Sequence, residues 1–254
     1  MSLRVDIRKR YKGFELEAAF SSGDGTLALL GASGSGKSLT LKCIAGLISP
    51  DEGVIEVDGR ILFDSVAGID KRPQERGVGY LFQSYALFPN MTVRQNIEIA
   101  YGKAGRNSDR DAEVKKLLEK YEIGELAARY PVQLSGGEQQ RAALARIFAS
   151  HPRALLLDEP FSALDSFLRE KMQAELKRII REYDGSVVLV THSRDEAYKI
   201  ADDLVILDKG RIAGDGPVRE VFRYPGNARA ARVTGCKNIS AIEKRGGRVF
   251  FAKD

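Results

Sequence analysis

The chain of 254 residues is 43% hydrophobic, enough for a sizeable core, yet no stretch approaches the roughly 18 apolar residues of a membrane helix, and the N-terminus lacks a signal peptide's apolar core. The net charge of +5 is small and no dense Lys/Arg tract occurs, so we expect a solvated surface with a small excess of bases and no nucleic-acid partner. The two cysteines, Cys43 and Cys236, sit in no CxxC pattern, which argues against a zinc site or a disulfide and is compatible with a reducing cytosol.

The first part of the chain reads mainly as strands. Apolar residues alternate through residues 3–20 and predict two half-buried antiparallel strands. The apolar run Thr26–Leu30 predicts a buried strand that meets a glycine-rich turn, and a helix should follow over residues 37–47. Further strand-like pieces occur at residues 54–57, 61–63 and 77–82.

The second part alternates helices with buried strands. Helices are expected at residues 107–125, with Val114, Leu117, Leu118 and Tyr121 on one face, and at 136–150. Asp165 can cap another helix, and apolar strands are predicted at residues 154–157, 186–190 and 204–207. Alternating buried strands and helices indicate a mainly parallel α/β sheet. From about residue 233 this rhythm weakens, apart from one strand-like piece at 248–252.

A glycine-rich loop follows the predicted strand Thr26–Leu30. Residues 31–38 read GASGSGKS and fit the pattern GxxxxGK[ST] of a P-loop, in the strand-to-helix context that this motif requires. Glycines let successive backbone N–H groups converge on phosphate oxygens, and the helix N-terminus adds partial positive charge. We expect Lys37 to reach the β- and γ-phosphates of a bound nucleotide and the Ser38 hydroxyl to bind Mg²⁺.

Two acids end the apolar strand that begins at Ala154. Adjacent residues of a strand point differently, so Asp158 can address the Mg²⁺ while Glu159 orients and activates the attacking water. Two acids after a strand are by themselves also compatible with a helix cap or a solvated turn.

A second possible anion cradle is the sequence LSGGEQQR at residues 134–141. A serine and two glycines open a predicted helix, so several N–H groups and one hydroxyl face forward. One nucleotide does not need two cradles on one chain, which favours a cradle that serves ATP held by a second copy. An ordinary serine cap with glycines for close packing is the alternative.

These motifs together resemble those of ABC ATPases. LSGGEQQR looks like the signature motif of that family, and its other motifs follow in the expected order over roughly residues 1–230. The resemblance implies that Gln83 senses Mg²⁺ and couples to a membrane partner, that Asp165 communicates across a dimer, and that His192 contacts the γ-phosphate. Tyr11 resembles the aromatic residue that stacks on adenine, with Phe14 as the alternative.

The resemblance implies an α/β fold of the P-loop NTPase class: an ABC nucleotide-binding domain at residues 1–232, with a RecA-like core, an antiparallel β subdomain and a helical signature subdomain at about 84–150. Glu159, His192, Lys37 and Gln83 would be catalytic, and Ser38, Gln83 and Asp158 would hold Mg²⁺. The nucleotide would be bound by the following residues: Tyr11, Gly31, Ala32, Ser33, Gly34, Ser35, Gly36, Lys37, Ser38, Leu39, Ser135, Gly136, Gly137 and Asp165.

The family further implies partners and a location. We expect a head-to-tail homodimer that sandwiches ATP, integral membrane permease subunits, indirectly a solute-binding protein, and a peripheral position on the cytoplasmic face of the membrane. The permease is expected to dock on residues 84–97, where Tyr85, Leu87, Phe88 and Met91 read as exposed apolar residues. Their folding back into the helical subdomain is the alternative.

The chain looks most similar to the motors of molybdate, sulfate and other oxyanion importers, on the stretch KRPQERGVGYLFQSYALFP at residues 71–89. Motors for iron, polyamines and sugars share much of it, and a soluble non-transport ABC ATPase is a further alternative, although no fused second domain or long coiled coil is visible. The stretch YPGNARAARVTGCKNIS at residues 224–240 resembles the start of the region that leads to an accessory β-domain, and we expect that domain to be absent or vestigial, with residues 233–254 a short C-terminal tail.

Overall fold

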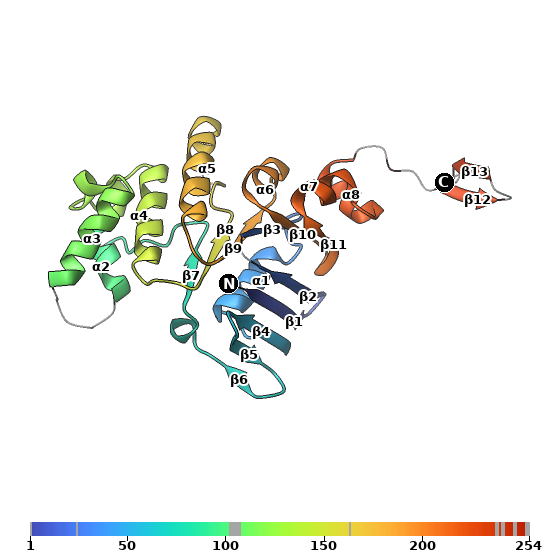
Figure 1. Ribbon diagram of the computed structural model, residues 1–254, viewed down its shortest axis with the longest axis horizontal. Coiled ribbons are helices and arrows are strands. Elements are labelled where there is room, and N and C mark those ends of the chain that lie inside the picture. The colour runs from blue at the N-terminus through green and yellow to red at the C-terminus, as the bar shows by residue number, and fades with distance from the viewer. Residues whose placement is uncertain are drawn as a thin grey trace.

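The computed structural model describes residues 2–23, 25–101, 108–162, 164–236, 239, 242–245 and 248–251. Asn107, Ala163 and Ala252, which belong to predicted segments, lie outside the described residues. A large mixed sheet with flanking helices makes up most of the described structure (Figure 1). Its strands are β1 (Leu3–Tyr11), β2 (Phe14–Ser22), β3 (Thr26–Leu30), β4 (Glu52–Val57), β5 (Arg60–Asp64), β6 (Ile69–Asp70), β7 (Val78–Leu81), β8 (Ala154–Asp158), β9 (Ser186–Thr191), β10 (Asp203–Asp208) and β11 (Arg211–Pro217).

The strand order is β6-β5-β4-β1-β2-β11-β10-β3-β9-β8-β7. The β10-β3-β9-β8-β7 part is parallel, and the β6-β5-β4-β1-β2 part is antiparallel. Strand β11 joins the two parts, since it pairs antiparallel with β10 and touches β2 in parallel. The predicted parallel α/β core and antiparallel β part are therefore confirmed. A separate hairpin is formed by β12 (Ile242–Arg245) and β13 (Arg248–Phe251).

The helices are α1 (Lys37–Ala45), α2 (Val93–Glu98), α3 (Ser108–Lys120), α4 (Gly136–Phe148), α5 (Ser166–Arg181), α6 (Arg194–Ile200), α7 (Val218–Arg223) and α8 (Ala228–Thr234). The longer ones confirm the predicted helices, and Asp165 caps α5 by accepting a hydrogen bond from the Leu168 N–H at 3.0 Å. Helices α2, α6, α7 and α8 were not predicted, because they have only six or seven residues each and so show too little of a 3.6-residue period.

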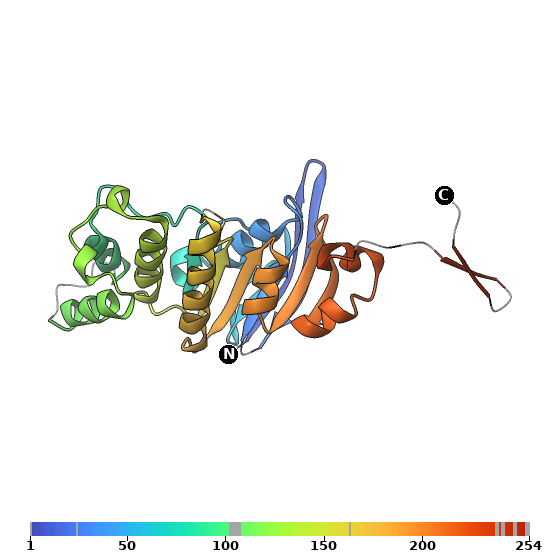
Figure 2. The ribbon, with the colours of Figure 1, turned by 90° about the horizontal axis from the view of Figure 1, so that it is seen from above.

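The buried residues of the parallel strands divide the core into layers. On β8, Leu155 and Leu157 pack with α4 and α5, whereas Ala154 and Leu156 pack on the side of α1 and the antiparallel strands. Because both faces are covered, these strands are apolar throughout rather than alternating. Helices α2, α3 and α4 gather at one end of the molecule, as Figures 1 and 2 show.

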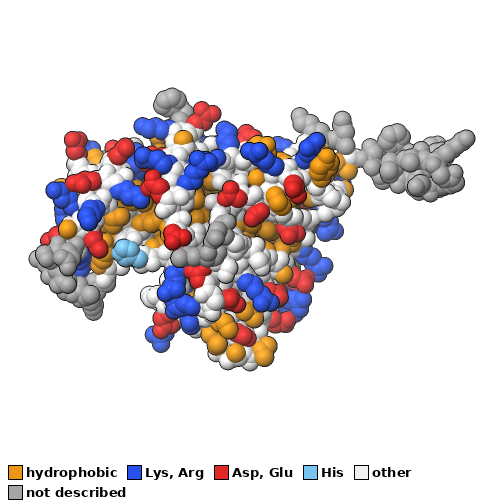
Figure 3. Space-filling view, in the orientation of Figure 1, with side chains coloured by type: hydrophobic (Ala, Val, Ile, Leu, Met, Phe, Trp, Pro, Cys, Tyr) orange, Lys and Arg blue, Asp and Glu red, His pale blue; other side chains and the backbone are white. Residues whose placement is uncertain are grey.

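One face of the molecule is mixed in charge, with hydrophobic side chains between the charged ones. On the face seen in Figure 3, Lys and Arg side chains are interspersed with Asp and Glu rather than gathered into one basic area. Among the described residues, none of the helices combines the length and apolar character needed to cross a bilayer.

Candidate functional site

The carboxyl ends of β3, β8 and β9 meet at one edge of the sheet and carry the predicted chemistry. A cleft of about 440 Å³ opens there, lined by Phe14, Ser33, Gly34, Gly36, Lys37, Ser38, Leu39, Gln83 and Glu159. Five elements or their ends contribute to it, and the predicted catalytic residues Lys37, Gln83 and Glu159 lie together in its wall.

The glycine loop adopts a backbone that other residues cannot follow. Gly34 and Gly36 have φ of 75° and 107°, in the left-handed region. A Cβ on Gly31 would lie 2.2 Å from the carbonyl oxygen of Leu207 on β10, so this position accepts only glycine. The loop is further held by a hydrogen bond from the Gly210 N–H to the carbonyl of Ser35 at 2.9 Å.

The Lys37 side chain is folded into the loop. Its ammonium donates to the carbonyls of Gly31 and Ala32, both at 2.9 Å, and only 4% of the residue is exposed. Burial lowers the pKa of Lys37, and the nearby carboxylates of Glu159 and Asp158 act in the opposite direction. These hydrogen bonds of the buried ammonium go to neutral carbonyls, so it is well suited to receive an anionic phosphate.

Each oxygen of the Asp158 carboxylate accepts one hydrogen bond from a hydroxyl group. Ser38 Oγ donates to Oδ1 at 2.7 Å, and the Tyr80 hydroxyl donates to Oδ2 at 2.8 Å. Ser38 and Asp158 thus bring a hydroxyl and a carboxylate together beside the loop, oxygen donors of the kind that Mg²⁺ takes along with phosphate oxygens and water. The described residues contain no cluster of three His, Cys, Asp or Glu side chains suited to a metal on its own.

Glu159 and His192 form a pair at the same edge. The Glu159 backbone is left-handed, with φ of 46°, and its N–H donates to the carbonyl of Val190 at 3.0 Å. This turn directs Glu159 toward the residue after β9, and Glu159 Oε2 lies 3.1 Å from His192 Nδ1. An acid and an imidazole in contact at the mouth of a phosphate cleft can orient water and exchange a proton with it.

The aromatic candidates end the β1–β2 hairpin, where Tyr11 and Phe14 are paired in register. Phe14 lines the cleft, and its ring tip would lie 3.2 Å from a Cβ on Gly36. Tyr11 is 49% exposed and is not part of the cleft wall. Both residues therefore lie at the same end of the β1–β2 hairpin, and Phe14 is the one that lines the cleft beside the glycine loop.

The second cradle lies apart from the cleft, at the start of α4. Ser135 is exposed, and its N–H and hydroxyl both donate to Glu138 Oε2, at 2.7 and 2.8 Å, in a capping box. These two bonds hold the pKa of Glu138 below its usual value, the backbone N–H contributing most. Gly136 and Gly137 pack closely on Leu164 and Met172, so the close-packing alternative also describes part of their role.

The segment after Gln83 corrects one prediction. Tyr85, expected at the surface, is 4% exposed with its hydroxyl directed at the carbonyl of Pro160, and Leu87 packs partly against the core. Phe88 is exposed, as predicted. Tyr85 and Ala86 have φ of 60° and 46°, in the left-handed region that non-glycine residues rarely adopt. This backbone changes the direction of the Tyr85 side chain from the one expected for an extended loop.

Half-buried Arg146 and fully buried Asn96, which no sequence pattern indicated, hold this segment. Arg146 of α4 donates to the carbonyls of Ala86 and Tyr85, at 2.6 and 3.1 Å. Asn96 of α2 donates to three carbonyls at residues 88, 91 and 92 and accepts from the Phe88 N–H. Asn96 is followed by Ile97 and Glu98, which give no local signal for the second contact.

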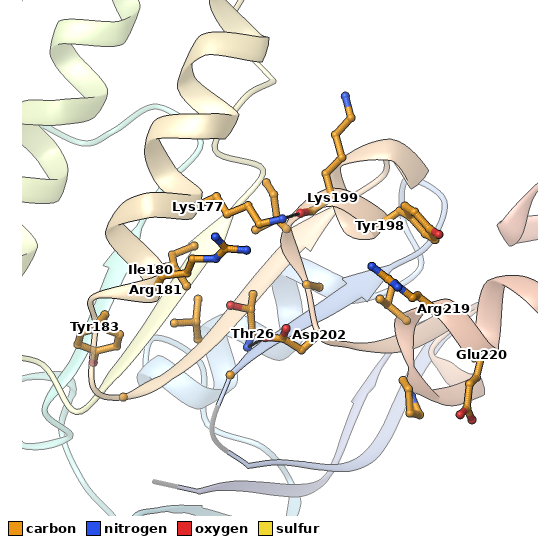
Figure 4. A pocket seen from close by; sticks show the side chains of 17 residues that line it. Thr26, Lys177, Ile180, Arg181, Tyr183, Tyr198, Lys199, Asp202, Arg219 and Glu220 are labelled. Carbon is orange, nitrogen blue, oxygen red and sulfur yellow. Dashed lines mark hydrogen bonds between the residues drawn. The ribbon is translucent and has the colours of Figure 1, made fainter.

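Another cavity lies away from this cleft. It has about 720 Å³ and lies at the opposite edge of the sheet, between the end of α5, α6 and the start of α7 (Figure 4). Lys177 and Arg181 extend over it from α5, and Lys177 donates to the carbonyl of Lys199, near the end of α6. Basic residues at helix C-termini stabilise those helix ends, which accounts for much of this lining without a ligand.

Fold and site together define a P-loop nucleotide-binding protein: a strand, a glycine loop and a helix, with acids at the end of a neighbouring parallel strand. The family model described as ABC transporter matches residues 18–162, and the chain belongs to this family.

Two similar proteins are named as ATP-binding proteins of importers. The molybdenum import ATP-binding protein ModC of Paramagnetospirillum magneticum is 41% identical over 224 residues, 88% of this chain and 61% of that protein. The sulfate/thiosulfate import ATP-binding protein CysA of Mesostigma viride is 42% identical over 233 residues, 89% of this chain and 64% of that protein. The chain thus spans about three fifths of the length of these relatives.

A solved structure shares the fold. The dimeric structure of a post-hydrolysis state of the ATP-binding cassette MJ0796 bound to ADP and Pi aligns with a TM-score of 0.70 and 29% identity, over 86% of this chain and 99% of that chain. The predicted ABC nucleotide-binding fold is therefore confirmed.

Proposed function

We propose that the protein is the ATP-hydrolysing motor subunit of a membrane importer for molybdate or a related oxyanion. The observation that carries the proposal is the contact of Ser38 with the strand-end carboxylate Asp158, 2.7 Å apart beside the glycine loop. A hydroxyl and a carboxylate in this position can bind the divalent cation that accompanies a nucleoside triphosphate. The neighbouring Glu159–His192 pair is placed to activate water.

In this proposal the loop binds the phosphates through its N–H groups and through Lys37. The Ser38 hydroxyl, the Asp158 carboxylate and the Gln83 side chain would hold Mg²⁺, which neutralises charge on the phosphates when bound. Glu159 orients the attacking water and accepts its proton, while His192 holds the γ-phosphate side of the site. Lys37 stabilises the charge that builds on the transferred phosphoryl group.

The remaining predicted residues concern adenine and a second subunit. Tyr11 would stack on adenine, with Phe14 as the alternative that its place in the cleft wall supports. Ser135, Gly136 and Gly137 would contact the ATP of a second copy in a head-to-tail dimer, and Asp165 would act across that interface. The exposed position of Ser135, away from the cleft of its own chain, supports this arrangement.

The importer would also contain integral membrane permease subunits and act with a solute-binding protein, so the motor would sit on the cytoplasmic face of the membrane. Phe88, Tyr130 and Val132 are exposed apolar residues near the segment after Gln83, and they suit a docked helix of the permease. The names of the relatives support molybdate or sulfate as the class of solute.

The test is reconstitution with a permease and its binding protein. Uptake of molybdate that requires ATP, and ATPase activity stimulated by the molybdate-loaded binding protein, are expected. The Glu159→Gln variant should support neither. Uptake driven only by a sugar- or polyamine-binding partner would reject the oxyanion assignment and retain the motor. Failure to assemble with any membrane partner, with free ATPase activity retained, would favour a soluble ABC ATPase.

A further inference from the structure

The hydroxyl of Tyr80 is the second group that fixes the carboxylate of Asp158. It donates to Oδ2 at 2.8 Å, while Ser38 holds Oδ1 at 2.7 Å. The carboxylate therefore has one donor at each oxygen, and its plane is set by two residues that come from different elements, β7 and α1.

The strand register explains how Tyr80 reaches this carboxylate. Tyr80 lies opposite Leu156 in the parallel pairing of β7 with β8. Asp158 lies two residues beyond Leu156 and so projects from the same face of the sheet. Such a diagonal neighbour on the next strand is within reach of an aromatic side chain.

The ring of Tyr80 is held independently of the hydroxyl. It packs against the ring of Phe82, with centroids 4.3 Å apart, and against the core that contains α1. A packed ring gives its hydroxyl a fixed position, so the hydrogen bond to Asp158 restricts the carboxylate rather than following it.

Tyr80 and Ser38 differ in their access to a nucleotide. Ser38 lies in the cleft wall and can turn an oxygen lone pair toward a cation, whereas Tyr80 is not part of that wall. Within the described residues, the contact of the Tyr80 hydroxyl with the site is its hydrogen bond to Asp158, so its effect on the site runs through this carboxylate.

We propose that Tyr80 is a positioning residue that sets the orientation of Asp158 and thereby the affinity of the nucleotide site for its divalent cation. The inference rests on the proposed metal site. Hydrogen-bond partners of metal-ligating carboxylates typically change metal affinity or activity by about 10- to 100-fold when they are removed.

The sharpest variant is Tyr80→Phe, which keeps the ring and its packing and removes one hydroxyl. Tyr183→Phe is the matched control, because it removes a comparable hydrogen bond, from Tyr183 to the carbonyl of Pro152 at 2.8 Å, outside the cleft. Both changes are made in a Glu159→Gln background so that the nucleotide is not consumed during binding measurements.

Binding of a fluorescent ATP analogue is measured in EDTA and through a Mg²⁺ titration, and bound Mn²⁺ is followed by electron paramagnetic resonance. For Tyr80→Phe we expect unchanged affinity in EDTA, a rise of about 10-fold or more in the Mg²⁺ midpoint, and weaker Mn²⁺ binding. Tyr183→Phe should match the parent in all three. In the active protein, turnover of Tyr80→Phe should recover at high Mg²⁺.

An unchanged Mg²⁺ midpoint would overturn the role of Tyr80. Equal loss of affinity with and without Mg²⁺ would also overturn it, because it would mean a purely structural role. If the parent itself showed no Mg²⁺ dependence, the proposed metal site would fall together with the inference. Should Tyr80→Phe not fold, Tyr80→Met, with a flexible side chain that fills irregular gaps, is put through the same titrations.

Discussion

The imidazole of His192 and the carboxylate of Glu159 lie 3.1 Å apart, although the two residues follow different strands. The parallel pairing of β8 with β9 places Asp158 opposite Val190, so both strands end at the same height. The left-handed turn at Glu159 then directs its side chain to the residue that follows β9. This geometry is the basis of the first prediction.

Replacing Glu159 by Gln should lower ATP turnover by about 100- to 10,000-fold, because the amide cannot accept a proton from water. ATP binding should persist, and the ATP-bound dimer should last longer. Turnover and size-exclusion profiles with ATP check both points. Glu170→Gln, an exposed acid with no ion pair among the described residues, is the control. Near-normal turnover of the Glu159 variant would remove this residue from the mechanism.

Replacing Lys37 by Ala should reduce ATP affinity and turnover together, because the ammonium addresses both the bound phosphates and the charge of the transition state. Equilibrium binding and steady-state kinetics measure the two effects. Lys42→Ala, which removes a lysine from the last turn of the same helix, should leave both nearly unchanged. Unaltered affinity and rate in Lys37→Ala would mean that the loop is only a turn.

The signature segment should act in trans. In a mixture of Ser135→Arg and Lys37→Ala subunits, the heterodimer should contain one intact composite site, so activity should reappear that neither variant shows alone. The measurement is ATPase activity against mixing ratio, with maximal recovery near equal amounts. A crosslink from one γ-phosphate to Lys37 and Ser135 of the same subunit would exclude the composite site.

Arg76 should be a major contributor to stability. The fully buried guanidinium donates to the carbonyls of Lys71, Cys43 and Ile44 and to Asp70, so it satisfies the end of α1. Arg76→Ala removes the donor of three carbonyls and leaves a cavity, and should lower the free energy of unfolding by about 3 kcal/mol. Urea unfolding measures it. Arg4→Ala, an exposed change on β1, should cost less than about 0.5 kcal/mol. Equal losses would mean that Arg76 contributes no more than a surface residue.

The capping box at Ser135 should make the start of α4 sensitive to acid. Because the pKa of Glu138 is lowered in the folded protein, its contribution is fully present above the unfolded value of 4.5 and is lost as the pH falls through the lower folded value. Glu138→Ala should cost about 1 kcal/mol at pH 7, and the gap to the parent should shrink toward pH 3. Glu138→Gln keeps the hydrogen-bond geometry and should cost less. Urea titrations at several pH values test this, and a gap that stays constant with pH would contradict it.

The sequence predicts those parts of the site that lie close together along the chain. Residues 31–38 and the pair Asp158–Glu159 are each contained in one short segment, so their pattern carries their chemistry. The contact of Tyr80 with Asp158 and that of Arg146 with residues 85 and 86 depend on the strand order and on helix packing, which no local pattern encodes. The burial of Tyr85 was mispredicted for a further reason: Tyr85 and Ala86 both have left-handed backbone, and two successive non-glycine residues of this kind have no clear sequence signal.

Strand β3 carries the glycine loop, but its neighbours in the sheet are β9 and β10, which end at Thr191 and Asp208. During synthesis the loop therefore leaves the ribosome before β9 and β10 and stays without its flanking strands until Asp208 has followed. Pairing over so long a separation is slow, because the entropy cost of closing the loop comes before the contacts that offset it. A nascent chain stalled before Asp208 would contain the complete loop motif but not the complete sheet that supports the loop.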